Sequence, residues 1–62
     1  MTAKEVIRLL EKNGWSEARQ SGSHKIFKHS TNPNNVSVPV HSSQDLKKGT
    51  LNDILKKAGL KT

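Results

Sequence analysis

The sequence carries a short amphipathic segment at each end, and each segment is followed directly by a glycine. In residues 2–13 apolar side chains recur every three or four positions, and they do so again in residues 51–58. This period is typical of an α-helix with one buried face. Gly14 and Gly59 can supply the left-handed residue that commonly ends a helix. We therefore expect the fold to begin and end with a helix.

Polar residues indicate where each helix starts. Thr2 and Glu5 fit a capping box, in which each of the two side chains satisfies a free backbone N–H at the helix start. Thr50 is expected to cap the second helix, and Asp53 to support its first turn. Trp15 follows the first helix at the position that packs back onto it, so we expect this single tryptophan to cover the core.

The middle of the chain shows strand patterns separated by turn residues. Residues 15–20 and 24–29 flank a Ser-Gly-Ser turn, and Asn-Pro-Asn-Asn at 32–35 forms a second turn. Valine then occupies every second position of residues 36–40, which is typical of a half-buried strand. Pro39 has no N–H to donate to a ladder, so this third strand should be an edge strand or end nearby.

The resulting order is α-β-β-β-α, which predicts a single α+β domain over residues 1–62. Three consecutive strands joined by short turns favour one three-stranded antiparallel sheet with two helices on one face. The other face of the sheet is then free for solvent or a ligand. The core should be thin, because a chain of this size buries only about 60% of its unfolded surface.

Basic residues dominate the charge of the chain. Eleven lysines and arginines outnumber five aspartates and glutamates, for a net charge of +6. A positive field on so small a surface attracts polyanions such as nucleic acids. Lysines on helices also keep small proteins in solution. The charge alone therefore leaves DNA, RNA and an acidic protein open as partners.

Several kinds of chemistry are disfavoured by composition. The chain has no cysteine, which excludes disulfides, thiolate metal sites and cysteine nucleophiles. The carboxylates are scattered and the three histidines lack i,i+4 spacing, so we predict no metal site and no cofactor. No apolar run is long enough to span a bilayer, and we expect a cytoplasmic protein without a membrane partner.

Cleavage of RNA fits these residues because RNA carries its own nucleophile. A base need only remove the proton of the 2′-hydroxyl while cations stabilise the phosphate, and one histidine with nearby lysines can do both. His24 opens the second strand just after Gly22, a residue type that permits close approach of a phosphate. The alternative is that Ser-Gly-Ser is only a hairpin turn and His24 a neutral surface residue.

The face of the sheet that carries His24 depends on how the second strand is turned. His24, Ile26 and Lys28 share one face. Phe27 faces the other way and is the better anchor beneath the helices, which would put His24 on the open face. The opposite arrangement would bury Ile26 and turn His24 inwards. The first strand does not decide between them, since Ala18 is its only small apolar residue.

The chain resembles the HicA family of bacterial toxins. The matching stretches are LLEKNGW, RQSGSHKIFKH, VSVPVH and DLKKGTLNDILKKAGL, which follow in order over nearly the whole sequence. Their combination is specific: Gly-Ser-His with an aromatic residue three positions later, then Leu-Lys-Lys-Gly-Thr-Leu, then Ala-Gly-Leu. The resemblance implies a fold like the double-stranded RNA-binding domain over residues 1–62.

The resemblance also implies the toxin of a type II toxin–antitoxin system, a metal-independent endoribonuclease that cleaves mRNA and arrests translation. His24 would be the catalytic histidine because it occupies the Gly-Ser-His position, and a HicB-like antitoxin would cover the site. For the second proton transfer, His29 and His41 are the natural choices. The residues expected to contact the RNA are Gly22, Ser23, Lys25, Lys28, Lys47 and Lys48.

Two other functions use the same features. A non-catalytic RNA-binding module of the double-stranded type would share the fold and the basic surface. A small interaction protein would use its charge only to recruit an acidic partner. RNA cleavage distinguishes the ribonuclease from the binding module, and RNA affinity at low salt distinguishes both of these from the interaction protein.

Overall fold

The computed structural model describes residues 1–40 and 45–60, and it has the predicted order of helices and strands. The three strands form one antiparallel sheet in the order β1-β2-β3. The predicted α+β fold, like that of the double-stranded RNA-binding domain, is confirmed. The elements are α1 (Ala3–Lys12), β1 (Ser16–Ser21), β2 (His24–Lys28), β3 (Val36–Pro39) and α2 (Lys48–Lys57).

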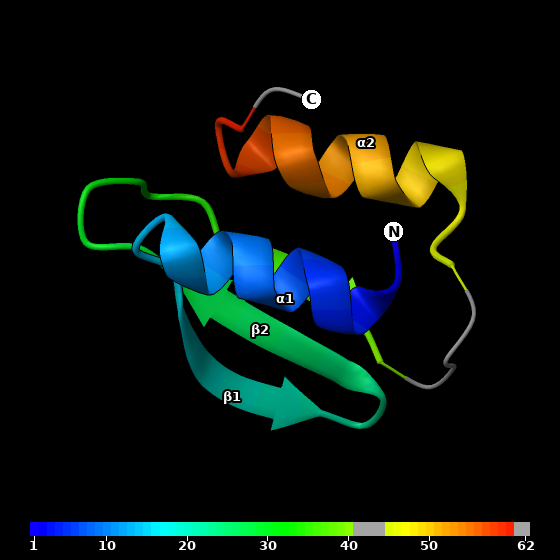
Figure 1. The fold of residues 1–62 in the computed structure, drawn as a ribbon. Helices are drawn as coiled ribbons and strands as arrows, with labels where there is room; N and C mark the ends of the chain where they lie inside the picture. Colours follow the sequence, from blue (N-terminus) through cyan, green and yellow to red (C-terminus); the bar gives the residue numbers. More distant parts are fainter. Residues whose placement is uncertain (41–44, 61–62) are drawn as a thin grey trace.

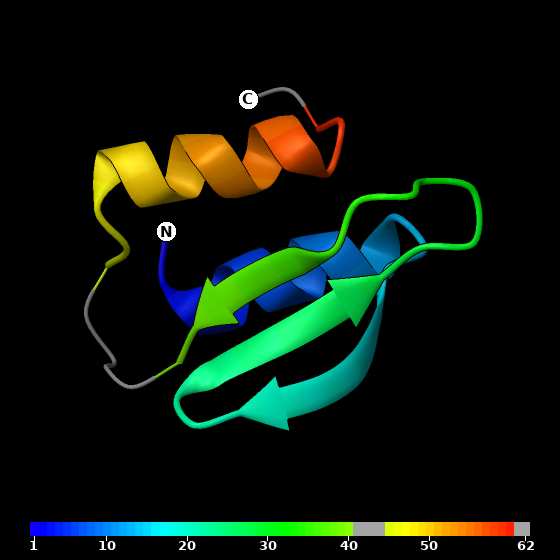
Figure 2. The ribbon, with the colours of Figure 1, turned by 180° about the vertical axis from the view of Figure 1, so that it is seen from behind.

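The two helices leave one face of the sheet uncovered. α1 crosses in front of the strands, and α2 lies beside α1 (Figure 1). Seen from behind, the strands stand in front and no helix covers them (Figure 2). Both helices contact β3, which is an edge strand that ends at Pro39, as the missing N–H of proline predicted. We call the uncovered side the open face.

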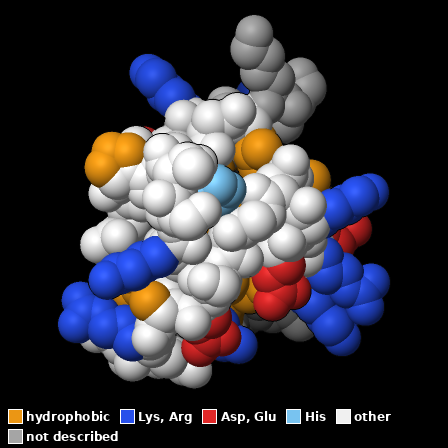
Figure 3. Space-filling view, turned by 90° about the vertical axis from the view of Figure 1, so that its left-hand side faces the viewer, with side chains coloured by type: hydrophobic (Ala, Val, Ile, Leu, Met, Phe, Trp, Pro, Cys, Tyr) orange, Lys and Arg blue, Asp and Glu red, His pale blue; other side chains and the backbone are white. Residues whose placement is uncertain are grey.

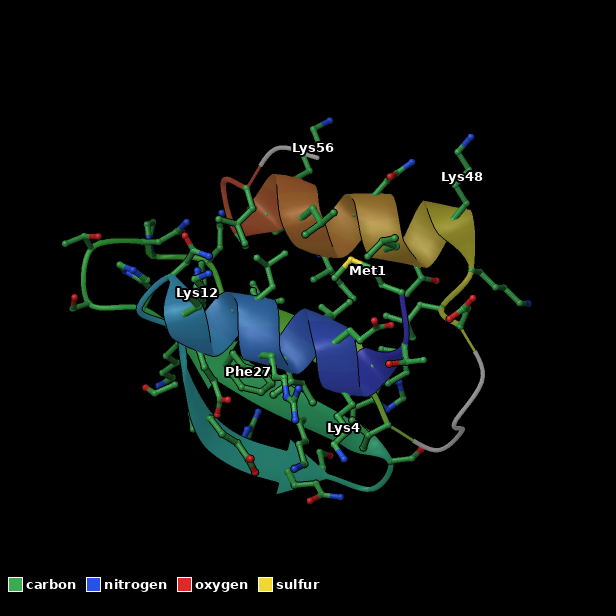
Figure 4. All side chains as sticks on the ribbon, in the orientation of Figure 1. Met1, Lys4, Lys12, Phe27, Lys48 and Lys56 are labelled. Atoms are coloured by element: carbon green, nitrogen blue, oxygen red, sulfur yellow. The ribbon has the colours of Figure 1, made fainter. Side chains whose placement is uncertain are left out.

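Phe27 anchors the core from the middle strand. Its side chain is fully buried and lies behind α1 (Figure 4). Val36 stands opposite Phe27 on β3, and Val38 follows two residues later; both are fully buried, which confirms the alternation read from the sequence. The other buried apolar side chains are those of Ala3, Val6, Leu10, Trp15, Ile54, Leu55 and Ala58.

α1 ends in the predicted glycine motif. Gly14 has a φ of 91°, and its N–H donates to the carbonyl of Glu11 over 3.2 Å. The N–H of Trp15 donates to the carbonyl of Leu10 over 3.0 Å, and the tryptophan is buried as expected. Trp15 therefore belongs to the end of the helix, and β1 begins one residue after it. α2 ends in the same way around Gly59, with a φ of 72°.

The start of α1 is capped as predicted. The N–H of Glu5 donates to the hydroxyl of Thr2 over 3.3 Å, and the N–H of Thr2 donates to the Glu5 carboxylate over 2.8 Å. The Thr2 hydroxyl also donates to the Glu5 carboxylate, over 3.2 Å. The two bonds that the carboxylate accepts from Thr2 favour its ionised form, so they hold the pKa of Glu5 below its ordinary value.

The predicted start of α2 was wrong. The helix begins at Lys48, and its N-cap, Lys47, makes no side-chain capping bond. Thr50 therefore lies inside the helix, and Asp53 pairs with Lys57 over 3.4 Å one turn later instead of supporting the first turn. Leu46 packs against the core just before the helix, so the chain is already fixed there and needs no side-chain cap to begin.

The hairpin between β1 and β2 has a loop of only two residues, Gly22 and Ser23. Ser21 pairs with His24 on the other strand, so the turn is one residue shorter than the predicted Ser-Gly-Ser turn. Gly22 has a φ of 58° at the first loop position, while Ser23 has a negative φ, which corresponds to a type II′ turn. This turn fixes the register of the two strands from His24 onwards.

Candidate functional site on the open sheet face

His24 is the first residue of β2, and its side chain is exposed. Because Phe27 points into the core, alternation along the strand puts His24 and Ile26 on the opposite, open face. Ile26 is half-buried there although no helix covers it. Of the two arrangements compatible with the sequence, the structure has the one with Phe27 inwards and His24 outwards.

Cross-strand pairing shows which side chains surround His24 on the open face. Ser21 and Pro39 stand directly opposite His24 on the two neighbouring strands. Arg19 stands opposite Ile26, the next residue of β2 on this face. Among the described residues, the open face contains two cations and no carboxylate. Its members are Ser16, Arg19, Ser21, His24, Ile26, Lys28, Ser37 and Pro39.

A β-bulge in β1 keeps a carboxylate away from this face. Counted from the turn, pairing is regular as far as Arg19 opposite Ile26; Ala18 is then skipped, and Glu17 stands opposite Phe27. In a regular ladder Ala18 would face Phe27 and Glu17 would fall on the open face. The bulge instead turns Glu17 to the side of the sheet that carries the helices.

Lys25 lies on the face opposite to His24, although the two are adjacent in sequence. Its ammonium nitrogen is 3.4 Å from a carboxylate oxygen of Glu17, on the side that carries the helices. Both side chains are partly exposed, so the pair contributes little to stability. Of the two lysines predicted on β2, only Lys28 shares the face of His24, where it is exposed.

Gly22 and Ser23 form the exposed loop that leads into His24. A Cβ at Gly22 would meet no atom within 4 Å, so glycine is favoured there by its backbone angle and not by crowding. The carbonyl of Ser23 accepts the N–H of Val40 over 2.7 Å, which ties the loop to the end of β3. The loop is therefore held in place while its outer surface is open.

Lys47 and Lys48 lie apart from the open face, at the start of α2. Both are exposed, and Lys48 projects from the helix on the side away from the sheet (Figure 4). The structure therefore brings Lys28 onto the same face as His24, but not Lys48.

His29 follows β2 and is held by hydrogen bonds. Its Nε2 lies 3.0 Å from the carbonyl of Asn13, and its Nδ1 accepts the N–H of Thr31 over 3.1 Å. The neutral ring with its proton on Nε2 satisfies both partners. The ring also packs against the ring of Trp15 in a T-shaped arrangement, with centroids 5.2 Å apart and planes at 60°. His29 therefore connects parts of the fold and does not stand beside His24.

A hollow of about 470 Å³ lies beside His29, and it does not include His24. Figure 3 looks onto this end of the molecule, where a histidine side chain lies among uncharged atoms. The hollow is lined by Asn13, Trp15, His29, Thr31, Asn32, Pro33, Ala58 and Leu60.

The acidic residues and histidines do not gather at one place within residues 1–40 and 45–60. No group of three or more of them is close enough to hold a metal ion in that part of the chain. His41, the other histidine considered for proton transfer, lies outside the described residues. Neither of the two helices described is long and apolar enough to cross a membrane.

The sequence expectations did not include Arg19. Its position could have been found from a two-residue turn, because pairing Ser21 with His24 puts Arg19 opposite Ile26. We instead expected a Ser-Gly-Ser turn and no definite register for the first strand.

The order α-β-β-β-α, with one three-stranded antiparallel sheet and two helices, defines a protein with a fold of the double-stranded RNA-binding-domain-like class. In this chain the uncovered face of the sheet carries an exposed histidine and two cations. Residues 3–60 match the model of the family described as HicA toxin of bacterial toxin–antitoxin. The chain belongs to the HicA toxin family, as its sequence motifs predicted, and it is thus the toxin partner of a toxin–antitoxin pairing. A comparison with curated proteins found no match.

Proposed function

We propose that residues 1–62 act as one domain, a metal-independent endoribonuclease that cleaves mRNA and thereby arrests translation. The observation that carries the proposal is the position of His24, which is exposed on a sheet face with two cations and no carboxylate among its described residues. Membership of the HicA toxin family supports the toxic role of this activity.

His24 serves as the general base in this proposal. No hydrogen bond to another described residue occupies its ring, in contrast to the ring of His29. A ring nitrogen of His24 takes the proton of the 2′-hydroxyl, and the 2′ oxygen bonds to phosphorus as the bond from phosphorus to the 5′ oxygen breaks. The leaving 5′ oxygen takes a proton from water. The products are a 2′,3′-cyclic phosphate and a 5′-hydroxyl.

The RNA lies across the open face in this proposal. Gly22 and Ser23 border His24 and allow a phosphate to approach, and Lys28 attracts the backbone further along β2. Lys47 and Lys48 contact more distant parts of the same RNA from the start of α2. A HicB-like antitoxin inhibits cleavage by covering the open face.

The test is the His24→Ala variant, with cleavage of a single-stranded RNA as the measurement. We expect the rate to fall about 10²- to 10⁴-fold, the effect of losing a general base. Thermal unfolding and RNA binding should not change, because the side chain is exposed and uncharged when it acts as a base. Single-stranded DNA of the same sequence, which lacks the 2′-hydroxyl, should bind but remain intact. Expression of wild type should arrest growth, and expression of the variant should not.

Three results would contradict the proposal. Purified His24→Ala that cleaves at the wild-type rate, with contaminating nuclease excluded, would remove His24 from the mechanism. Activity that disappears in EDTA and returns with a divalent ion would refute metal independence. If wild type binds RNA and never cleaves it, the protein is an RNA-binding module instead.

A further inference from the structure

We infer that Arg19 binds the phosphate on which His24 acts, and that it stabilises the charge which develops there during cleavage. This inference rests on the proposed ribonuclease function and assigns a role within the same site.

The short turn of the hairpin determines the position of Arg19. Ser21 pairs with His24, so two residues further from the turn Arg19 pairs with Ile26 on the same face. Arg19 and His24 are therefore diagonal neighbours, a relationship in which the Cα atoms are about 7–8 Å apart and the Cβ atoms somewhat closer. A group of phosphate size placed between them is within reach of both side chains.

Lys28 is the other cation on the open face, and it lies further from His24. Four residues along one strand separate the two, which is about 13 Å at 3.3 Å per residue. Arg19 is thus the cation better placed to contact the reacting phosphate, whereas Lys28 is placed for a neighbouring part of the backbone.

The guanidinium of Arg19 is available for a ligand. Arg19 is exposed and takes part in no ion pair within residues 1–40 and 45–60. The acidic residue nearest to it in sequence, Glu17, is turned to the other face by the bulge and pairs with Lys25. Opposite Arg19, the half-buried Ile26 offers an apolar surface for the aliphatic part of the arginine.

Arginine suits the chemistry of this position. Its planar guanidinium can donate two parallel hydrogen bonds to two oxygens of one phosphate. During attack by the 2′ oxygen, negative charge builds up on the non-bridging oxygens, and a donor aimed at them lowers the barrier. This role requires Arg19 neither to accept nor to release a proton, because the guanidinium of an arginine is charged in proteins.

The test compares Arg19→Gln with Arg8→Gln. Arg8 is an exposed arginine on α1, on the side of the sheet that carries the helices, so the two variants lose the same charge from opposite sides of the molecule. We expect Arg19→Gln to lower kcat about 10²-fold at saturating RNA, the usual effect of losing one charge-stabilising donor. Arg19→Lys should recover part of this loss, and Arg8→Gln should cleave as wild type does.

A binding measurement tests the phosphate interaction independently of cleavage. With single-stranded RNA that carries 2′-O-methyl groups and resists cleavage, the affinity of wild type should fall as salt rises. A plot of the logarithm of the association constant against the logarithm of salt concentration should be less steep by about 0.7 for Arg19→Gln. This is the amount expected when one phosphate is no longer neutralised by the protein. Arg8→Gln should keep the wild-type slope. Thermal unfolding of each variant shows that the fold is intact.

The outcomes distinguish this inference from the proposed function. If wild type cleaves RNA and Arg19→Gln has the same kcat and salt slope as Arg8→Gln, Arg19 has no role in the site and the ribonuclease proposal stands. If wild type cleaves no RNA, the ribonuclease proposal fails together with the role of Arg19 in cleavage. The salt slope then still decides whether Arg19 contacts phosphate.

Discussion

A hydrogen bond of 3.0 Å joins the ring Nε2 of His29 to the backbone carbonyl of Asn13, and so ties the end of β2 to the end of α1. The side-chain amides of Asn32 and Asn34 donate to the carbonyl of Lys57, which connects the loop after β2 to α2. The last carbonyls of helices have no partner within the helix. At this end of the molecule, side chains of residues 29–34 supply hydrogen-bond donors for carbonyls at the ends of both helices.

Replacing His29 should therefore affect stability more than chemistry. His29→Ala removes hydrogen bonds to Asn13 and Thr31 together with the ring contact to Trp15. We expect the free energy of unfolding in urea to fall by about 1–3 kcal/mol, given about 1 kcal/mol for each hydrogen bond. Cleavage per folded molecule should be retained. An unchanged free energy of unfolding together with abolished cleavage would contradict this structural role and show that His29 takes part in cleavage.

Gly14 should tolerate a side chain less well than Gly59. Both glycines have a positive φ, which is strained for any other residue. A Cβ at Gly14 would lie 2.8 Å from Nε2 of His29, whereas a Cβ at Gly59 would meet no atom within 4 Å. Gly59→Ala should cost about 1–2 kcal/mol for the backbone alone. Gly14→Ala should cost more, as measured by urea unfolding.

The His29→Ala background provides the control for this comparison. If the contact with the imidazole causes the extra cost, Gly14→Ala should destabilise the His29→Ala protein no more than Gly59→Ala does. Costs for Gly14→Ala that are equal in the two backgrounds would show that the ring is not involved.

The two threonines near helix starts should respond differently to alanine. Thr2→Ala removes an N-cap and should lower the free energy of unfolding by about 1 kcal/mol. Thr50→Ala should have almost no effect or stabilise slightly, because Thr50 lies within α2 and alanine is the better helix former. Urea unfolding of both variants checks this, and a larger loss for Thr50→Ala would show that α2 starts at that residue.

Glu5 should make stability depend on pH in the acidic range. Hydrogen bonds from the backbone and hydroxyl of Thr2 lower the pKa of Glu5 from its ordinary value of 4.5, so the ionised form is favoured in the folded chain. The resulting stabilisation is fully present above the unfolded pKa and disappears as pH falls through the lower, folded pKa. Unfolding measured from pH 7 to pH 3 should show this decline.

The Glu5→Gln variant isolates this contribution. Glutamine can still accept the capping bond but does not ionise, so its stability should vary less over the same pH range. The difference between wild type and variant should be constant near neutral pH and shrink below about pH 4.5, the ordinary value. A difference that grows on acidification would contradict the cause assigned to the pKa of Glu5.

Local signals in the sequence predicted much of the fold. The capping box of Thr2 and the glycines after each helix act within a few residues of themselves, and all of them appear in the structure. Phe27 and the alternating valines indicated the buried side of the sheet correctly, because each is large or regularly spaced. These features depend little on distant parts of the chain.

Other features depend on contacts that the sequence does not display. α2 starts before Thr50 because Leu46 is fixed against the core, and a capping pattern alone carries no such information. The place of Arg19 depends on the length of the hairpin loop, and the pairing of Lys25 depends on a bulge at Ala18. A hairpin loop longer by one residue would move Arg19 to the other face, and a strand without the bulge would move Glu17, the partner of Lys25, to the open face. The sequence therefore predicted Gly22, Ser23 and Lys28 beside His24, but neither the place of Arg19 nor the turning away of Lys25.

The bulge at Ala18 has a second consequence, which concerns association between molecules. β1 is an edge strand, and its six residues are all exposed. Exposed edges invite pairing with strands of other molecules, and a bulge makes an edge a poorer template because it interrupts the row of free backbone groups. At the opposite edge, Pro39 withholds a donor from β3. Both edges of this small sheet thus carry a feature that hinders pairing with a further strand.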